Sequence, residues 1–294
     1  MLTHSPNKYN IVFMGVKGMN EIVKYNNTLN TLQFKDFTAM DYNVLMCLCH
    51  KLRNKGDKEL VFTFKELKEL TEFGNHSDKL FADDLDRMID KLIKVNATHI
   101  TGDEKSRFVL FPTFTTNTVK GTLKVSVNKK FAYILNELTD NFTRFELSEF
   151  AQLDGKYAKT LYRMLKQYKH TGWWKPTVED FKIVMDIPEA YTNKIIMRDI
   201  IKPTMSTLAT KFNNLKCEPI KAKKRGAPIV QYYFTWQAEK QLKGQTNIND
   251  AEKELIEYNA SKKKTKKAAK KNSFNNFKQN TYDFDELEKQ LLDN

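Results

Sequence analysis

The side chains that most often carry out catalysis are few and scattered in this chain. A metal-dependent nickase would need an HxH or HxxxH spacing to hold its metal, and none occurs among the five histidines, His4, His50, His76, His99 and His170. No GxxxxGK[ST] motif offers a site for ATP phosphates, and no carboxylate cluster suggests a two-metal nuclease. We therefore expect a protein that is not an enzyme and that needs no metal or cofactor.

The cysteines and the hydropathy pattern bear on the location of the protein. Cys47, Cys49 and Cys217 form no CxxC pair, and their odd number fits a reducing cytoplasm. No window approaches the run of about 18 apolar residues that spans a bilayer. Residues 1–10 lack the apolar core of a signal peptide. We expect a cytoplasmic protein with no membrane partner.

Basic side chains are the main chemical feature of the sequence. The chain has 49 Lys and Arg residues against 36 Asp and Glu residues, a formal net charge of +13. Residues 155–240 hold 17 of these cations and 7 of the acids and so supply +10, whereas residues 1–128 supply only +3. Charge concentrated in one segment favours a polyanion, above all DNA, as its partner. The alternative is a generally lysine-rich surface.

A row of cations lies along the helix expected over residues 192–213. Lys194, Arg198 and Lys202 follow one another at i+4 steps. The apolar stripe on the other side of this helix is expected to be Met197, Ile201, Met205, Leu208 and Phe212. A basic helix face suits the major groove of B-DNA, where arginine can bind guanine O6 and N7 together; a solvated face is the alternative. Because Pro203 removes the hydrogen bond to Asp199, we expect a kink or a later helix start.

A basic turn follows in the hairpin expected over residues 215–236. Four cations precede Gly226 in this turn: Lys221, Lys223, Lys224 and Arg225. Such a hairpin tip favours contact with phosphates or with the minor groove, the alternative being a flexible lysine loop. Lys156 and Lys159, in the helix expected over residues 155–170, complete the predicted DNA contacts.

The elements that position these cations form a winged helix-turn-helix. The helix over residues 155–170 is followed by a capping box, Thr177-Val-Glu-Asp180, which opens a short helix. The long basic helix and the β-hairpin come next. Two helices at a turn, followed by a hairpin, define the winged helix-turn-helix.

The first half of the chain repeats this order. Capping boxes begin at Thr38 and Thr63, and Ser77 opens a longer helix with apolar residues spaced four, three, four and three apart. The caps Thr63 and Thr177 are 114 residues apart, which indicates an internal duplication.

The hairpin of the first half is expected from residues 97–101 and 107–114, with residues 122–127 closing the unit. The longer helix of this half carries four acids: Asp83, Asp84, Asp86 and Asp90. These acids would repel phosphates. We therefore expect the first unit to be a weaker DNA contact, a dimerisation surface, or both.

The sequence thus predicts an α+β protein of two tandem winged helix-turn-helix domains, residues 1–128 and 129–240. A flexible tail, residues 241–294, is expected to follow. The tail contains a lysine block, Ser261–Lys271, and an acidic amphipathic end, Tyr282–Leu292. We expect the acidic end to dock on a partner protein as a short helix; the alternative is that it folds back onto the lysine block.

Three stretches carry a resemblance to a known family. They are Tyr157-Ala-Lys-Thr-Leu-Tyr-Arg-Met-Leu-Lys-Gln-Tyr168, Met197-Arg-Asp-Ile-Ile-Lys-Pro203 and Lys224-Arg-Gly226. With them, residues 9–240 resemble the iteron-binding, theta-type replication initiators (Rep proteins) of bacterial plasmids, which are built from two winged helices. The first unit matches more loosely, around Phe37–Leu52.

The resemblance implies a function. Members of this family bind tandem repeats at the origin as monomers and often repress their own promoter as dimers, so a monomer–dimer equilibrium is expected. The second winged helix is usually the stronger DNA contact, the host initiator and helicase are recruited, and no cofactor is needed. A dedicated transcriptional repressor would use the same helices and stays open as an alternative. A nicking replication enzyme is the other alternative, although the histidine pair that it needs is missing.

Overall fold

The computed structural model describes residues 21–74, 77–101, 104–136, 138–139, 141–223 and 226–239, without the side chains of residues 97–106. The predicted flexible tail, its lysine block and its docking end lie outside these residues. Among the helices of the described residues, none combines the length and the apolar character that crossing a membrane requires.

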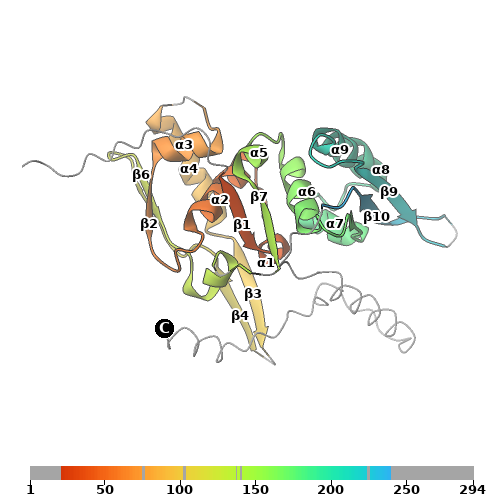
Figure 1. The fold of residues 1–294 in the computed structure, drawn as a ribbon, viewed down its shortest axis with the longest axis horizontal. Coiled ribbons are helices and arrows are strands. Elements are labelled where there is room, and N and C mark those ends of the chain that lie inside the picture. Colours follow the sequence, from red (N-terminus) through yellow and green to blue (C-terminus); the bar gives the residue numbers. More distant parts are fainter. Residues whose placement is uncertain are drawn as a thin grey trace, which may run out of the picture.

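The first winged helix begins with the predicted helices in the predicted order (Figure 1). They are α2 (Ala39–Leu52), α3 (Phe64–Thr71) and α4 (Asp78–Leu92), with the strand β2 (Leu60–Thr63) before α3. The capping box at Thr38 is confirmed, since its hydroxyl accepts a hydrogen bond from the Asp41 amide while the Asp41 carboxylate accepts one from the Thr38 amide. The Thr63 hydroxyl caps α3.

The predicted hairpin of the first half forms, but its strands stand apart from the sheet of the first winged helix. The sheet has the order β2-β6-β5 and uses β5 (Phe114–Asn117) and β6 (Thr122–Val125), whereas β3 (Asn96–Thr101) and β4 (Glu104–Val109) form a separate two-stranded hairpin. The run expected over residues 107–114 is split. Pro112 has no amide for a β-ladder, and Leu110 and Phe111 are both buried, which departs from the alternation of a strand with one face in solvent.

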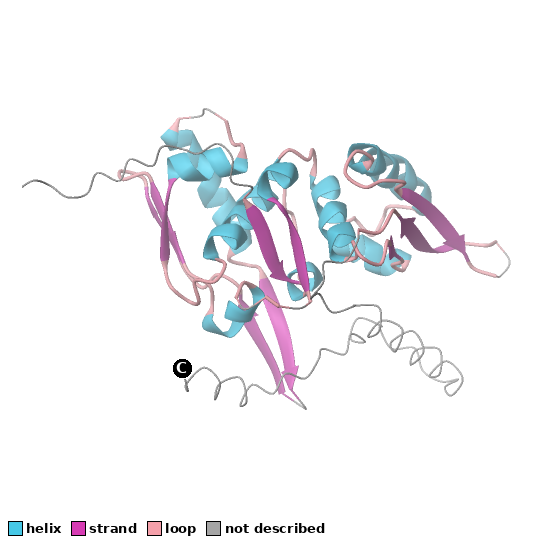
Figure 2. Cartoon of the chain, in the orientation of Figure 1, coloured by secondary structure: helices cyan, strands magenta, loops and turns pink. Residues whose placement is uncertain are grey.

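The second winged helix agrees closely with the sequence prediction. It consists of α6 (Lys156–Gln167), β8 (Trp173–Trp174), α7 (Val178–Val184), one continuous helix over residues 193–208, and the hairpin β9 (Lys216–Lys221) with β10 (Ile229–Thr235). The sheet order is β8-β10-β9. Thr177 caps α7 by accepting from the Asp180 amide at 3.0 Å. The fold of two tandem winged helices is confirmed, and Figure 2 shows their helices and small sheets alternating along the molecule.

An aromatic cluster forms the core of the second winged helix. The ring of Phe181, which is fully buried, lies 5.0 Å from Tyr232, 5.7 Å from Phe234 and 6.0 Å from Trp174. These rings come from α7, β10 and β8. The cluster therefore fixes α7 to the sheet. It also contacts the start of the following helix, because the Tyr232 hydroxyl donates to the Asn193 side chain at 2.9 Å.

Residues 129–151 pack with the first winged helix, across the division expected after residue 128. The strand β1 (Ile22–Asn26) pairs antiparallel with β7 (Phe142–Glu146), and α5 (Leu147–Ala151) contacts α2 and α3. The short α1 (Thr28–Thr31) and the 3-10 helix η1 (Lys129–Ile134) complete this unit. The packing places the division between the units at α6.

The helix α6 is the element of the second winged helix that faces the first winged helix (Figure 1), and it is buried from both sides. On the first side, Arg163 is 1% exposed and donates from Nη1 to the Asn30 side chain at 3.1 Å, with the rings of Phe34 and Tyr42 within 5.1 Å of its guanidinium. On the second side, the Tyr162 ring lies 5.7 Å from Phe212, beyond the long helix. This shared helix joins the two units.

Candidate nucleic-acid interface

The helix over residues 193–208 has the position of a recognition helix. It is the second helix of the helix-turn-helix, after α7, and it precedes the hairpin of β9 and β10. The structure divides it into α8 (Asn193–Ile195), a π-helical segment η2 (Ile196–Ile201) and α9 (Lys202–Leu208). Lys194, Arg198 and Lys202 are all exposed on it, as the sequence predicted. The buried stripe is shifted from the predicted one and consists of Ile196, Ile200, Ile201, Thr204 and Leu208, while Met197 and Met205 are half-buried.

A π segment lies directly before Pro203, where the sequence predicted a kink or a later helix start. The helix does not start late, since it begins at Asn193 and runs through Pro203, and the Lys202 amide donates to the Met197 carbonyl five residues earlier. Buried residues four apart drift by about 40° per step around an α-helix. A π turn contains more residues than an α-helical turn and rotates in the opposite sense to this drift over four residues. The buried stripe therefore stays on one side of the helix.

An acid interrupts the basic face of this helix. The Asp199 carboxylate accepts from Arg198 Nε at 2.6 Å and from Arg198 Nη2 at 2.8 Å, and both side chains are exposed. This hydrogen-bonded pair raises the pKa of Arg198 and lowers the pKa of Asp199 relative to their ordinary values. Asp199 was not among the residues predicted from the sequence, although its place beside Arg198 was an available signal.

The hairpin of β9 and β10 extends away from the molecule as a wing (Figure 1). Lys221 and Lys223 are exposed on it, and the Ala222 amide donates to the Pro228 carbonyl at 2.8 Å near the tip. Gly226 has a φ of 82°, which favours glycine, and a Cβ there would meet no atom within 4 Å. The other two predicted contacts, Lys224 and Arg225, lie outside the described residues.

Lys156 connects the two units. Its ammonium lies 2.9 Å from Asp186 Oδ2, and the same oxygen accepts from the Asp36 amide at 3.1 Å. Asp36 precedes α2 and Asp186 follows α7, so the carboxylate bridges the first winged helix, α6 and the second winged helix. A DNA contact by Lys156 would have to compete with this ion pair.

Lys159 is a correction to the predicted DNA contacts. It is 1% exposed, and its ammonium donates to the carbonyls of Phe150 at 2.7 Å and Ala151 at 2.9 Å, at the end of α5. A buried ammonium cannot reach a phosphate. Lys159 instead binds carbonyls at the C-terminal end of α5, where a helix has no i+4 amides left to pair with them.

The buried ammonium of Lys159 should give stability a measurable pH dependence. Burial lowers its pKa from 10.5 to about 8. Between these values the unfolded chain binds a proton that the folded protein has released, so stability rises with pH. Relative to Lys159→Met, which does not titrate, we expect the free energy of unfolding to rise by roughly 2–3 kcal/mol from pH 7 to pH 10. Urea unfolding at both pH values measures this, and a constant difference between the proteins would contradict it.

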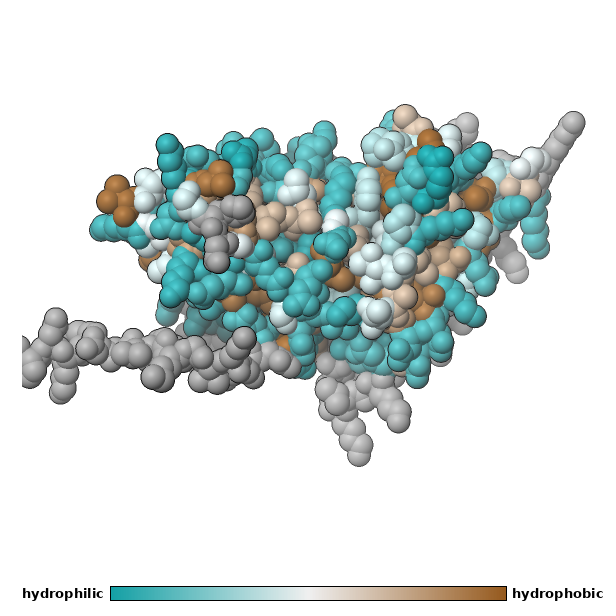
Figure 3. Space-filling view, turned by 90° about the horizontal axis from the view of Figure 1, so that it is seen from above, coloured by the Kyte–Doolittle hydropathy of each residue, from teal (hydrophilic) through white to brown (hydrophobic). Residues whose placement is uncertain are grey.

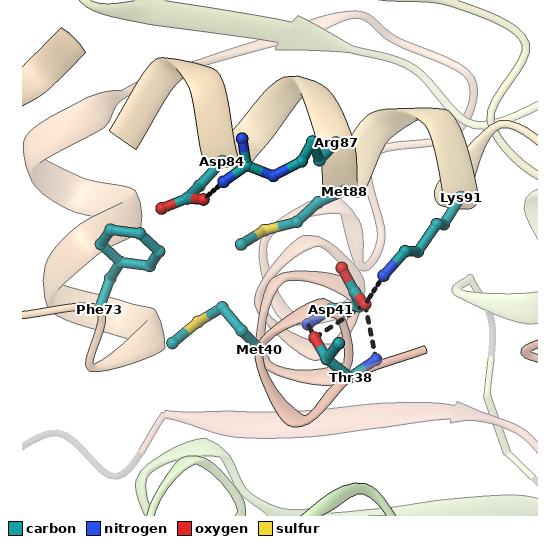
Figure 4. A pocket seen from close by; sticks show the side chains of 8 residues that line it. All are labelled: Thr38, Met40, Asp41, Phe73, Asp84, Arg87, Met88 and Lys91. Carbon is teal, nitrogen blue, oxygen red and sulfur yellow. Dashed lines mark hydrogen bonds and ion pairs between the residues drawn. The ribbon is translucent and has the colours of Figure 1, made fainter. Parts of the chain in front are cut away.

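The equivalent helix of the first winged helix, α4, presents acids. Asp83, Asp86 and Asp90 are exposed on it. Figure 4 shows the pocket between α2 and α4, where Asp84 pairs with Arg87 and Lys91 donates to Asp41 at 2.7 Å. Two of the cations of α4 are therefore already held by carboxylates, and this helix offers DNA far less positive charge than the helix over residues 193–208.

The face of the molecule seen from above in Figure 3 is mainly hydrophilic, with small and separate hydrophobic patches on the described part. Large contiguous apolar patches mark many protein interfaces. A mainly hydrophilic face suits a polar partner better than it suits an apolar protein surface.

Comparisons with known proteins agree with this architecture. The family model described as "Initiator Replication protein, WH1" matches residues 22–166, and the model described as "Initiator Rep protein, WH2" matches residues 177–236. The first match ends within α6, close to the division that the packing indicates. A "Probable replication protein rep" of Bifidobacterium longum (strain NCC 2705) is 35% identical over 223 residues, which cover 75% of this chain and 74% of that protein.

A solved structure has the same fold. The Pi initiator protein, in its crystal structure in complex with iteron DNA, matches with a TM-score of 0.54 at 13% identity, over 76% of this chain and 99% of that one. The two family models together match more than half of this chain, in the order of its two winged helices. The chain therefore belongs to the family of plasmid replication initiator (Rep) proteins with two winged-helix domains.

Proposed function

We propose that this protein binds tandem repeats of double-stranded DNA at a plasmid origin and starts replication there, acting by binding and recruitment. The second winged helix is the main DNA contact. The observation that carries the proposal is the exposed row of Lys194, Arg198 and Lys202 on a recognition helix, beside a basic wing. In this arrangement the helix enters the major groove and the wing contacts the backbone.

The first winged helix has a supporting role in this proposal. Its α4 carries exposed acids at the position of a recognition helix, so it makes a weaker DNA contact, a contact between two copies of the chain, or both. Monomers bind the repeats and dimers repress the promoter of the gene. The host initiator and helicase are then recruited to the repeats in the cytoplasm. The dimerisation and recruitment steps rest on the family to which the chain belongs.

Maintenance of a plasmid tests the proposal against a dedicated repressor. An origin plasmid without the gene is supplied with the protein in trans. We expect wild type to maintain it, and Lys194→Ala/Arg198→Ala/Lys202→Ala to lose it. The matched triple variant Lys55→Ala/Lys58→Ala/Lys65→Ala, which removes three exposed cations from the first winged helix outside α4, should retain it. If the origin plasmid is maintained when no protein is supplied, and the promoter of the gene is no longer repressed in those cells, the dedicated repressor would be favoured.

Removing the charge of the wing should change the salt dependence of DNA binding. We expect substitution of Lys221, Lys223, Lys224 and Arg225 by alanine to weaken binding to every duplex. The slope of log K against log salt concentration should shrink by about 0.9 for each phosphate that the wing no longer neutralises. Titrations at several salt concentrations measure it, and an unchanged slope would mean that the wing points away from the duplex.

A further inference from the structure

We propose that Asp199 determines base specificity by holding Arg198 in the orientation in which its free edge binds guanine. This inference rests on the proposed function, because it assumes that the helix over residues 193–208 enters the major groove. It assigns to an acidic side chain on a basic surface a role in positioning rather than in contacting DNA.

The geometry of the pair leaves the outer edge of the guanidinium available. A guanidinium has five N–H groups. Asp199 accepts from Nε at 2.6 Å and from Nη2 at 2.8 Å, and so occupies the side edge of Arg198. One N–H on each of Nη1 and Nη2 then points outward in parallel, the arrangement that binds guanine O6 and N7. The same arginine can bind its neighbour and a base together.

The backbone of this segment brings the pair together. Adjacent residues of an α-helix are about 100° apart around the axis and do not face each other. Arg198 and Asp199 both lie in the π segment, whose wider turn reduces this angle. The buried neighbours Ile200 and Ile201 anchor the segment.

An acidic side chain at position 199 is unfavourable for general DNA binding, so its presence needs an explanation. A carboxylate beside three exposed cations weakens attraction to phosphates. If Arg198 were free, however, it would lose side-chain freedom when it bound a base. The pair orders the arginine before DNA arrives, so the cost to general affinity is offset by selectivity for one base.

The test is Asp199→Ala, with Glu189→Ala as the matched control, because Glu189 is an exposed acid in the turn that precedes the same helix and does not pair with Arg198 in the structure. Dissociation constants are measured in full-length protein for the repeat, for duplexes with each guanine replaced in turn, and for a random duplex. We expect Asp199→Ala to bind the random duplex more tightly. Its discrimination against replacement of one guanine should fall roughly two- to tenfold, the factor that matches the cost of ordering one long side chain. Glu189→Ala should keep full discrimination, and Asp199→Asn, which retains an acceptor, should keep part of it.

A double variant separates this inference from the proposed function. In the Arg198→Ala background, Asp199→Ala should leave discrimination at that guanine unchanged. If Asp199→Ala tightens binding to all duplexes equally and keeps discrimination intact, Asp199 only repels DNA and the inference is overturned. If Arg198→Ala itself affects all sequences equally, the base contact of the proposed function fails, and the inference fails with it.

Discussion

Arg198→Ala is expected to weaken binding to the origin repeat by roughly 1–3 kcal/mol, which is about 5- to 150-fold in Kd. The reason is that alanine cannot replace the bidentate hydrogen bonds of arginine to guanine O6 and N7. The effect should be confined to duplexes that contain that guanine, so the variant should also tolerate another base there. Competition binding with single-base variants of the repeat measures both effects.

The control for this prediction is Lys65→Ala, which removes one exposed cation from α3 of the first winged helix. It should change affinity for the repeat by less than Arg198→Ala and should leave base preference unchanged. An equal weakening by Arg198→Ala on every duplex, random sequences included, would show that Arg198 binds a phosphate instead.

Phe181→Ala is expected to destabilise the second winged helix by about 3–5 kcal/mol, the usual cost of deleting a buried phenylalanine ring. Phe181 is fully buried and contacts rings from two strands, so the neighbours cannot close the space without moving the sheet. DNA binding should be abolished at temperatures where wild type still binds. Urea unfolding followed by tryptophan fluorescence measures the change, since Trp174 lies in the same cluster.

The matched variant for the core is Glu179→Ala, an exposed position on the same helix. It should change stability by no more than about 0.5 kcal/mol. A destabilisation below about 1 kcal/mol for Phe181→Ala would mean that the aromatic cluster does not hold the second winged helix together.

The two winged helices could be predicted because their signals are local. The caps Thr63 and Thr177 and the i+4 row of cations depend on residues within one turn or one helix, and the structure has them where the sequence put them. The hairpin of β3 and β4 was predicted in part, whereas the strand β5 was not, because several β-prone runs compete in this part of the chain. Apart from β2, the strands of the winged-helix sheet lie within residues 114–125 because β6 pairs with β2, and this contact between distant residues has no local signal.

The remaining differences depend on contacts between distant parts of the chain. The sequence contains no sign that Lys159 meets the end of α5, or that β1 pairs with β7 more than 110 residues later. The pairing of Arg198 with Asp199 is local, but it depends on a π turn that helical periodicity does not predict. Charge and spacing therefore identified the basic surface, while tertiary packing decided which of its lysines are accessible.

The most direct test of the central claim is a footprint of the full-length protein on the plasmid that carries its gene. We predict protection of several regularly spaced copies of one sequence at the origin. Lys194→Ala/Arg198→Ala/Lys202→Ala should abolish this protection, and Lys55→Ala/Lys58→Ala/Lys65→Ala should retain it. Protection of a single promoter site without repeats, or equal protection by both triple variants, would contradict the claim.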